Sequence, residues 1–394
     1  MSSKEIFVVS AVRSAIGSFG GSLKDLPLAD LATQVSRAAI ERSGVAAEQI
    51  GHVVMGNVIP TEPRDAYLGR VAAMNAGIPK ETPAFSVNRL CGSGLQAIVS
   101  ATQGLLLGDS DIALAAGAES MSRGPYLLPQ ARWGARMGDL QGIDYMVGIL
   151  QDPFEHFHMG ITAENVAAAH GISREMQDEV ALTSQLRAAR AIAEGRFDGQ
   201  IVPIEIKTRK GPVQFAVDEN VRGDASVEQL AAMKAVFKKD GTVTAGNASS
   251  INDGAAGLVL ATGDAVRRQG LKPLARIVAY AHAGVEPALM GLGPIPATQK
   301  VLEKAGLKVA DLDVIESNEA FASQACAVAR ALGFDPEKVN PNGSGISLGH
   351  PVGATGAIIA TKAIHELHRV QGRYALATMC IGGGQGIAVI FERV

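Results

Sequence analysis

Short apolar runs alternate with longer amphipathic segments along the first third of the chain. Runs of strand length lie at residues 6–10, 53–56 and 112–115, and segments of helix length lie at residues 30–43 and 91–107. Strands that alternate with helices in this way predict an α/β architecture. A similar order of elements returns near the C-terminus, which prompts a search for an internal repeat.

One candidate repeat aligns without gaps. Residues 38–57 match residues 300–319, and both read as a helix that ends at a glycine before a polar turn and an apolar strand. The same offset carries Cys91 into the segment HPVGATGA and Ala118 onto Cys380. Because functional sites of α/β proteins gather at the carboxyl ends of strands, we expect a site between two similar halves.

A long segment rich in turn signals separates the two halves, with one helix expected at Glu175–Glu194. We interpret it as a loop domain that covers the site. The expected domains are an N-terminal half of residues 1–120 plus 245–270, a loop domain of residues 121–244, and a C-terminal half of residues 271–394.

The composition is that of a globular protein with a large core, since 47% of the 394 residues are hydrophobic and 19% are charged. A formal net charge of −3 gives no electrostatic reason to expect a nucleic acid or an anionic membrane as partner. The longest charge-free run, residues 90–108, is interrupted by glycine and polar residues, unlike a membrane span.

The cysteines and the N-terminal residues both indicate the cellular compartment in which the protein is expected. Three widely spaced cysteines do not form a disulfide framework, which indicates a reducing compartment. The N-terminal residues lack the apolar stretch and cleavage site of a signal peptide. We therefore expect a cytoplasmic protein.

Cys91 follows the strand-like run PAFSVNRL and opens CGSGLQAIVSATQGLLLGD, whose apolar residues recur at helical spacing. A thiol at the start of a helix lies at the positive end of the helix dipole, which favours the reactive thiolate. Free cysteines are, however, commonly buried for packing alone. On this pattern alone, Cys91 is either a nucleophile or a structural cysteine.

Two further candidates lie in glycine-rich segments near the C-terminus. His350 lies in NPNGSGISLGHPVGATGA with Pro351 near the first helical position, and histidine is the natural base for a thiol near neutral pH. Cys380 closes the strand YALATM and opens CIGGGQG, whose glycines can expose backbone N–H groups to an anion. The alternatives are a hydrogen-bonded loop histidine and a small residue at a tight hairpin.

The remaining polar candidates are weaker. Asn318, at the end of an apolar strand in SNEAFASQ, could hold a water or stabilise an oxyanion, but turn-capping asparagines are equally common. Cysteine and histidine are zinc-type ligands, yet the short ligand spacings of structural zinc sites are absent, so we predict no metal. Lys207, Arg209 and Lys210 could meet phosphates, although such a run is usually a solvated face.

Four motifs in order, VNRLCGSGLQA, SNEAFASQ, SGISLGHPVGATGA and MCIGGGQG, together resemble the thiolase superfamily over essentially the whole chain. The nearest group is the bacterial acetyl-CoA acetyltransferases and β-ketothiolases. The resemblance implies two similar βαβ-type halves in a layered α-β-α-β-α arrangement, with an inserted loop domain over the CoA site. It also implies a homotetramer whose tetramerisation segment is Tyr126–Arg136.

The implied activity is that of an acyl-CoA C-acetyltransferase. It reversibly condenses acetyl-CoA with an acyl-CoA, or cleaves a 3-ketoacyl-CoA with free CoA, with short-chain substrates expected and no further cofactor. By resemblance, Cys91 accepts the acyl group with help from His350, and Cys380 is the acid or base at the second thioester. One oxyanion hole would use His350 with a water held by Asn318, and the other the N–H groups of Cys91 and Gly382.

The resemblance also implies contacts along the CoA thioester. The residues expected to bind substrate are Arg222, His158, Ser249, Ala320, Phe321, Met159, Leu150 and Met290. Arg222 matches a position near the nucleotide, whereas Leu150 and Met290 match positions near the acyl group. Three departures from the family pattern, at Ser317, at Ser250 and in the segment VRGDAS, leave the implied mechanism unchanged. They do not define the acyl-chain preference or the biosynthetic or degradative direction.

Two other functions share features of this pattern. Ketoacyl synthases have the same fold and a nucleophilic cysteine, but they resemble a Cys-His-His or Cys-His-Asn set, so Cys380 at the third position favours thiolase. A CoA- or lipid-binding carrier on an inactive scaffold is the non-enzyme alternative, because fold does not fix function. Such a carrier would be free to lose Cys91 or Cys380, and this chain keeps both.

Overall fold

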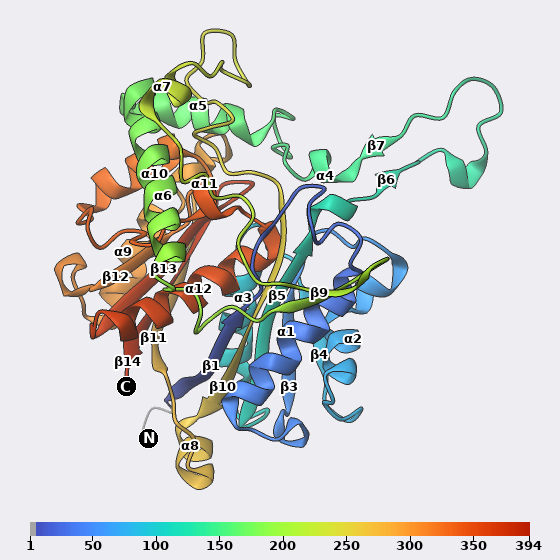
Figure 1. Cartoon of the computed structure of the whole chain (residues 1–394), viewed down its shortest axis with the longest axis vertical. Coiled ribbons are helices and arrows are strands. Elements are labelled where there is room, and N and C mark those ends of the chain that lie inside the picture. The colour runs from blue at the N-terminus through green and yellow to red at the C-terminus, as the bar shows by residue number, and fades with distance from the viewer. Residues whose placement is uncertain (1–4) are drawn as a thin grey trace.

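The structure is a computed structural model that describes residues 5–394. Residues 1–4, where the expected N-terminal half and the search for a signal peptide begin, lie outside the described residues. Ten strands form one mixed sheet, and helices cover it (Figure 1). The α/β architecture predicted from the alternating pattern is therefore confirmed.

The N-terminal half contributes five strands in the order β1-β10-β5-β3-β4, with a short β2 beside β10. β10 runs antiparallel to both β1 and β5, whereas β3 runs parallel to β5 and β4. The elements of this half are β1 Ile6–Arg13, β2 Gly17–Ser18, α1 Leu28–Ser43, β3 His52–Gly56, α2 Leu68–Asn75, β4 Ala84–Val87, α3 Ser93–Leu107, β5 Ile112–Ser120, β10 Asn252–Thr262 and α8 Gly263–Gln269.

The C-terminal half repeats this topology, because its order β11-β14-β13-β12 has the same sequence of antiparallel and parallel pairings. Its elements are β11 Ala275–Gly284, α9 Pro294–Ala305, β12 Val314–Ser317, α10 Ala322–Leu332, α11 Gly345–Leu348, α12 Val352–Arg369, β13 Tyr374–Ile381 and β14 Gln385–Arg393. The aligned helices α1 and α9 end at Gly44 and Gly306, with φ of 71° and 68°. The repeat detected in the sequence is thus a structural repeat.

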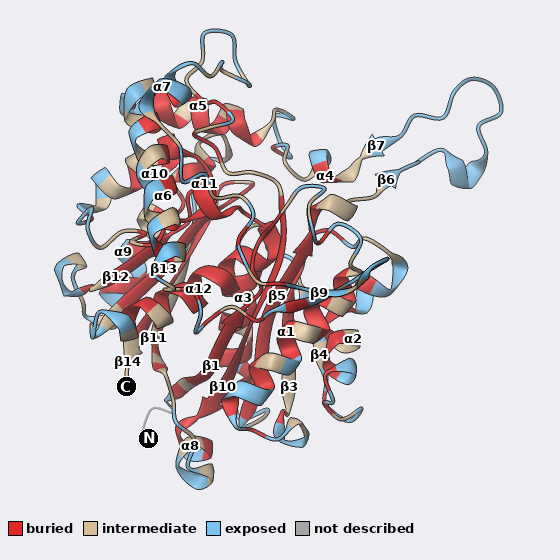
Figure 2. Ribbon diagram, in the orientation of Figure 1, coloured by how far each residue is buried: buried red, intermediate tan, exposed pale blue. Residues whose placement is uncertain are grey.

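Strand periodicity sorts the core into layers. In β5, Ala113 and Ala115 pack with α3 and α12, whereas Leu114 and Ala116 pack with α1. The strands of the other half likewise face α3 and α12 on one side and α9 on the other. α3 and α12 therefore form a buried central layer between two sheet halves, as the implied α-β-α-β-α arrangement requires (Figure 2).

The two central helices touch through glycines. A Cβ on Gly94 of α3 would lie 2.5 Å from the backbone nitrogen of Ala357, and a Cβ on Gly356 of α12 would lie 2.2 Å from that of Leu95. No side chain fits at either position, so the backbones themselves are in contact. The apolar run Leu90–Leu107 is long enough to cross a membrane by composition, but 61% of it is buried, and this packing accounts for its apolar character.

Residues 121–244 lie mostly outside the two halves, and a thin arm, residues 126–144, projects from them (Figures 1 and 2). Their elements are β6 Tyr126–Leu127, β7 Ile143–Asp144, α4 Tyr145–Gly148, α5 Met159–His170, α6 Arg174–Ala193, β8 Ile204–Thr208, β9 Gly211–Phe215 and α7 Val227–Ala231. The helix expected at Glu175–Glu194 is α6, one residue earlier at each end. The domain boundaries themselves stay a prediction.

A buried ion pair fastens this segment to the sheet. Arg13 of β1 donates two hydrogen bonds to Asp218, at 2.8 and 3.0 Å, and a third at 2.8 Å to Gln200. Both charged side chains are fully buried. A buried ion pair is stable only when well-formed hydrogen bonds compensate for the loss of water, and the two bonds to Asp218 meet this condition. The pair therefore holds the segment around Asp218 against β1.

We predict that Gly356→Ala destabilises the whole fold, because the added methyl group meets backbone rather than a movable side chain. Overpacking of this kind costs about 1–3 kcal/mol, which should appear as a lower midpoint of unfolding in urea. Gly148→Ala is the matched control, since no atom lies within 4 Å of its Cβ position. An unchanged midpoint for Gly356→Ala would contradict the contact.

Candidate active site

A cavity of about 570 Å³ lies where the two halves meet residues 121–244. Cys91, His350, Cys380 and Gly382 line it. All eight expected substrate contacts line it as well: Arg222, His158, Ser249, Ala320, Phe321, Met159, Leu150 and Met290. The structure thus gathers these residues, which are widely scattered along the sequence, around one space.

Cys91 lies in a tight turn between β4 and α3. The prediction that it opens the helix is wrong by two residues, because α3 begins at Ser93. Leu90 has φ of 44°, a left-handed conformation that is uncommon for a bulky side chain. The hydroxyl of Ser93 holds the turn by donating to the carbonyl of Leu90 at 2.7 Å and accepting from the N–H of Arg89 at 2.9 Å.

The thiol of Cys91 is protonated near neutral pH. Burial raises its pKa to about 11, although the backbone N–H groups of Gly382 and of Cys91 itself act in the opposite direction. Burial thus opposes the thiolate expected at a helix start. The two N–H groups that approach the sulfur are nevertheless those that the resemblance assigns to an oxyanion hole.

His350 is held at two points. Its backbone N–H donates to the Oδ1 of Asn252 at 2.9 Å, and its Nδ1 lies 2.7 Å from the Oγ1 of Thr355. Pro351 is the N-cap of α12 rather than its first residue, a small correction to the expected helix start. Burial lowers the pKa of His350 to about 4, so the ring is neutral at pH 7 and can accept a proton.

Cys380 lies inside β13 and not at its end, because the strand continues to Ile381 and Cys380 pairs with Gly386 of β14. The turn that follows uses left-handed backbone at Gly383 and Gly384, with φ of 79° and 84°. Burial and then the negative charge on Cys91 raise the pKa of Cys380. The two sulfurs are therefore close enough that ionising one opposes ionising the other.

Asn318 follows β12 but does not line the cavity. It is fully buried, and neither Nδ2 nor Oδ1 has a hydrogen-bond partner among residues 5–394. Gly345 is packed tightly against it, since a Cβ there would lie 2.9 Å from Oδ1. An amide with free hydrogen-bonding capacity suits the expected water-holding role, which stays a prediction.

The expected pantetheine contact His158 is fixed by its surroundings. It caps α5, where its Nδ1 accepts from the N–H of Gly160 at 3.0 Å, so the ring proton is on Nε2. The ring stacks on Phe237 with centroids 4.6 Å apart, and Phe237 meets Phe321 edge-on at 6.4 Å. Phe237 was not identified from the sequence, because no motif surrounds it.

Two other supporting residues were also missed. Thr355 lies within HPVGATGA, so its hydroxyl five positions after His350 was the available signal. Glu119 lies at the end of the small-residue strand IALAAGAES, where a lone carboxyl group was the signal. It accepts the N–H groups of Ile59 and Gly353 at 3.0 and 2.8 Å and so ties β5 to the start of α12. Burial raises the pKa of this carboxyl to about 8.

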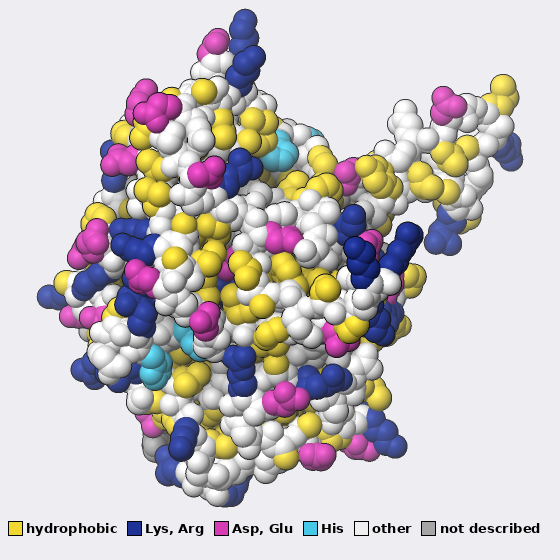
Figure 3. Space-filling view, in the orientation of Figure 1, with side chains coloured by type: hydrophobic (Ala, Val, Ile, Leu, Met, Phe, Trp, Pro, Cys, Tyr) yellow, Lys and Arg dark blue, Asp and Glu magenta, His cyan; other side chains and the backbone are white. Residues whose placement is uncertain are grey.

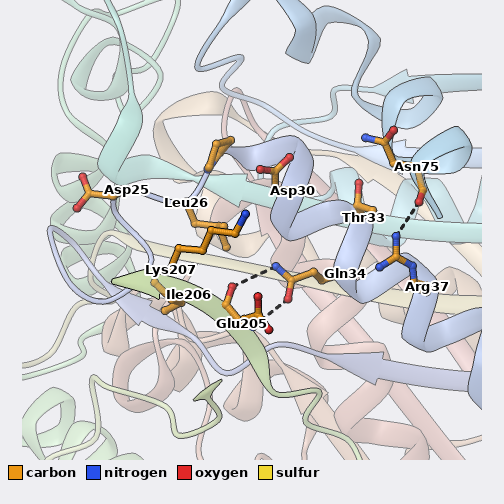
Figure 4. Close-up of a pocket in the computed structure, with 11 residues that line it drawn as sticks. Asp25, Leu26, Asp30, Thr33, Gln34, Arg37, Asn75, Glu205, Ile206 and Lys207 are labelled. Carbon is orange, nitrogen blue, oxygen red and sulfur yellow. Dashed lines mark hydrogen bonds between the residues drawn. The ribbon is translucent and has the colours of Figure 1, made fainter. Parts of the chain in front are cut away.

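A second hollow of about 730 Å³ lies between α1 and β8 (Figure 4). Acidic Asp25, Asp30 and Glu205 line it together with basic Arg37 and Lys207, and none of the reactive candidates is present. Arg37 donates a hydrogen bond to the carbonyl oxygen of Asn75 at 2.8 Å. The hollow is lined by charges of both signs and lacks a set of reactive side chains like that around Cys91. Within residues 5–394 no three His, Cys, Asp or Glu side chains gather to hold a metal ion.

Comparison with known proteins agrees with this geometry. The family model described as "Thiolase, N-terminal domain" matches residues 6–264, and "Thiolase, C-terminal domain" matches residues 271–393. The chain is 64% identical to β-ketothiolase BktB of Cupriavidus necator, over 99% of this chain and 100% of that protein. It is 50% identical to an acetyl-CoA acetyltransferase of Escherichia coli, over 99% and 100%. Human mitochondrial 3-ketoacyl-CoA thiolase in complex with CoA superposes with a TM-score of 0.96 at 45% identity, covering 99% and 98% of the two chains.

Proposed function

This chain belongs to the thiolase family, and we propose that Cys91, His350 and Cys380 divide the chemistry of its reaction between them. The chain is an acyl-CoA C-acetyltransferase: it condenses acetyl-CoA with an acyl-CoA and, in reverse, cleaves a 3-ketoacyl-CoA with free CoA. Its substrates are CoA thioesters. The observation that carries the proposal is that a protonated thiol, a neutral imidazole and a second thiol line one cavity.

In the first half-reaction, Cys91 attacks the thioester carbonyl while His350 takes the thiol proton. A pKa of about 11 makes the free thiol a weak nucleophile at pH 7, so a base must act as the sulfur attacks. The neutral ring of His350 can supply it. The N–H groups of Cys91 and Gly382 then receive the developing oxyanion, and the acyl group stays on Cys91.

In the second half-reaction, Cys380 removes a proton from the α-carbon of acetyl-CoA. An ionised Cys91 would raise the pKa of Cys380 further. Because the acylated Cys91 is an uncharged thioester, no negative charge on that sulfur opposes ionisation of Cys380 in this step. The second oxyanion would lie beside His350 and accept a hydrogen bond from a water held by the amide of Asn318.

The CoA thioester fits the cavity with its nucleotide outward. Arg222 is exposed and can meet phosphates, whereas His158 presents an Nε2–H that can bind a pantetheine carbonyl. Ser249, Ala320, Phe321, Met159, Leu150 and Met290 line the remaining wall. Short acyl chains are the proposed substrates. The nucleophile, the acid–base groups and the N–H donors are all protein groups, so we propose no cofactor beyond CoA thioesters.

We also propose a homotetramer in the cytoplasm. The arm exposes Tyr126, Trp133 and Met137, and the last two are 85% and 96% exposed. Hydrophobic side chains are visible along the arm (Figure 3). Apolar side chains this open mark a protein contact, and a second copy of the chain is the proposed occupant. Three free cysteines suit a reducing compartment, which fractionation of native cells would test.

We predict that Trp133→Asp on the arm breaks the assembly into smaller species, because a charge replaces an apolar contact. Mass photometry of the purified protein measures this directly. Arg267→Asp, on an exposed surface of α8 away from the arm, is the control and should leave the mass unchanged. A wild type that is already monomeric would overturn the proposed tetramer.

Cys380→Ser should separate the two half-reactions. The variant keeps Cys91 and His350, so it still accepts an acetyl group from acetyl-CoA, seen as an adduct by intact mass. It loses condensation, since a serine hydroxyl is a far weaker base than a thiolate. Absence of the acetyl adduct on this variant would contradict the proposed division of roles.

The proposed function is tested by thiolysis of acetoacetyl-CoA and 3-ketovaleryl-CoA with free CoA. Wild type should cleave both, before and after dialysis against EDTA, and Cys91→Ala should cleave neither. A faster rate with a much longer ketoacyl chain would refute the short-chain proposal. A wild type inactive on every chain length would favour the carrier alternative.

A further inference from the structure

The ring of His350 has a single hydrogen-bond partner within residues 5–394, the hydroxyl of Thr355 on the first turn of α12. The Nδ1–Oγ1 distance is 2.7 Å, and the same Oγ1 lies 3.0 Å from the carbonyl oxygen of Pro351. Both side chains are almost completely buried, at 5% and 2% exposure. No solvent competes for these bonds, so their direction follows from the protein groups alone.

The direction is set by the single proton of the hydroxyl. When Oγ1 of Thr355 donates to the carbonyl of Pro351, it is free to accept the Nδ1–H of His350, and both bonds form. In the reverse arrangement Oγ1 donates to Nδ1, and the bond to the carbonyl is lost. Nε2 has no hydrogen-bond partner among residues 5–394 in either arrangement, so the additional bond to the carbonyl of Pro351 decides between them.

We propose that Thr355 is a positioning residue that sets the tautomer of His350, so that Nε2, in a ring that lines the same cavity as Cys91, is left unprotonated to accept the thiol proton. The inference rests on the proposed function, in which that proton transfer starts acylation. As the Cys91 sulfur bonds to the acyl carbon, its proton passes to Nε2. When the bond between that carbon and the CoA sulfur breaks, Nε2 returns the proton to the CoA sulfur.

The bond from Nδ1–H to Thr355 persists through both transfers. It therefore holds the ring orientation and also stabilises the positive charge that the ring carries between them. The carbonyl of Pro351, which also accepts the N–H groups of Ala354 and Thr355 at 2.9 Å, anchors the end of this chain. A change at Thr355 thus acts on Cys91 through His350, without touching substrate.

The test is the single-turnover rate of acetylation of Cys91 by acetyl-CoA, followed by intact mass. Thr355→Val keeps the shape but cannot accept Nδ1–H, so the rate should fall roughly 10–100-fold, as is usual when the partner that orients a functional histidine is removed. The KM for acetyl-CoA should stay near that of wild type. Thr355→Ser keeps a hydroxyl and should restore the rate.

Two controls separate positioning from packing. Thr361→Val removes an equivalent buried hydroxyl on α12, bonded to the carbonyl of Ala357 at 2.9 Å, and should acetylate like wild type. In a His350→Asn background, Thr355→Val should cause no further loss, because its effect passes through the ring. If Thr355→Val does not fold, judged by circular dichroism, Thr355→Ala takes its place.

Acetylation of the valine variant at the wild-type rate would overturn the inference. So would a serine variant as slow as the valine variant, or a full additional loss in the His350→Asn background. A wild type that forms no acetyl-Cys91 would instead refute the proposed function, so the two failures are distinguishable.

Discussion

The backbone contact between α3 and α12 is the constraint on which the rest of the structure depends. Each helix begins two residues after a reactive side chain, Cys91 before α3 and His350 before α12. Gly94 and Gly356 let the two backbones meet where any side chain would collide. The spacing of Cys91 and His350, the proposed nucleophile and base, therefore depends on this close contact, and the repeat places one helix in each half.

Burial then determines the chemistry. It shifts the pKa values of Cys91, Cys380 and His350 toward their neutral forms. The proposed mechanism therefore moves protons between neutral groups, and backbone N–H groups receive the negative charge that develops. Supporting residues such as Thr355 and Asn252 matter because they are buried, where each hydrogen bond fixes an orientation.

Periodicity in the sequence was sufficient for the architecture and the repeat, and local patterns marked Cys91, His350 and Cys380. The substrate contacts in the cavity followed from the family resemblance instead. The sequence pattern misplaced boundaries where a long-range partner decides: Cys91 falls outside α3 since Ser93 locks a left-handed Leu90, and Cys380 falls within β13 since Gly386 of β14 pairs with it. It missed Phe237 and the buried pair Arg13–Asp218, whose partners are distant in sequence. Contacts of this kind leave no periodicity and no motif in the chain.

The most direct test of the account is a crystal structure of the enzyme after reaction with acetyl-CoA. The account predicts an acetyl thioester on Cys91, with its carbonyl oxygen within hydrogen-bond reach of the backbone nitrogens of Cys91 and Gly382, and Nδ1 of His350 still bonded to Thr355. An acetyl group on Cys380, or a carbonyl oxygen turned away from those two nitrogens, would contradict it.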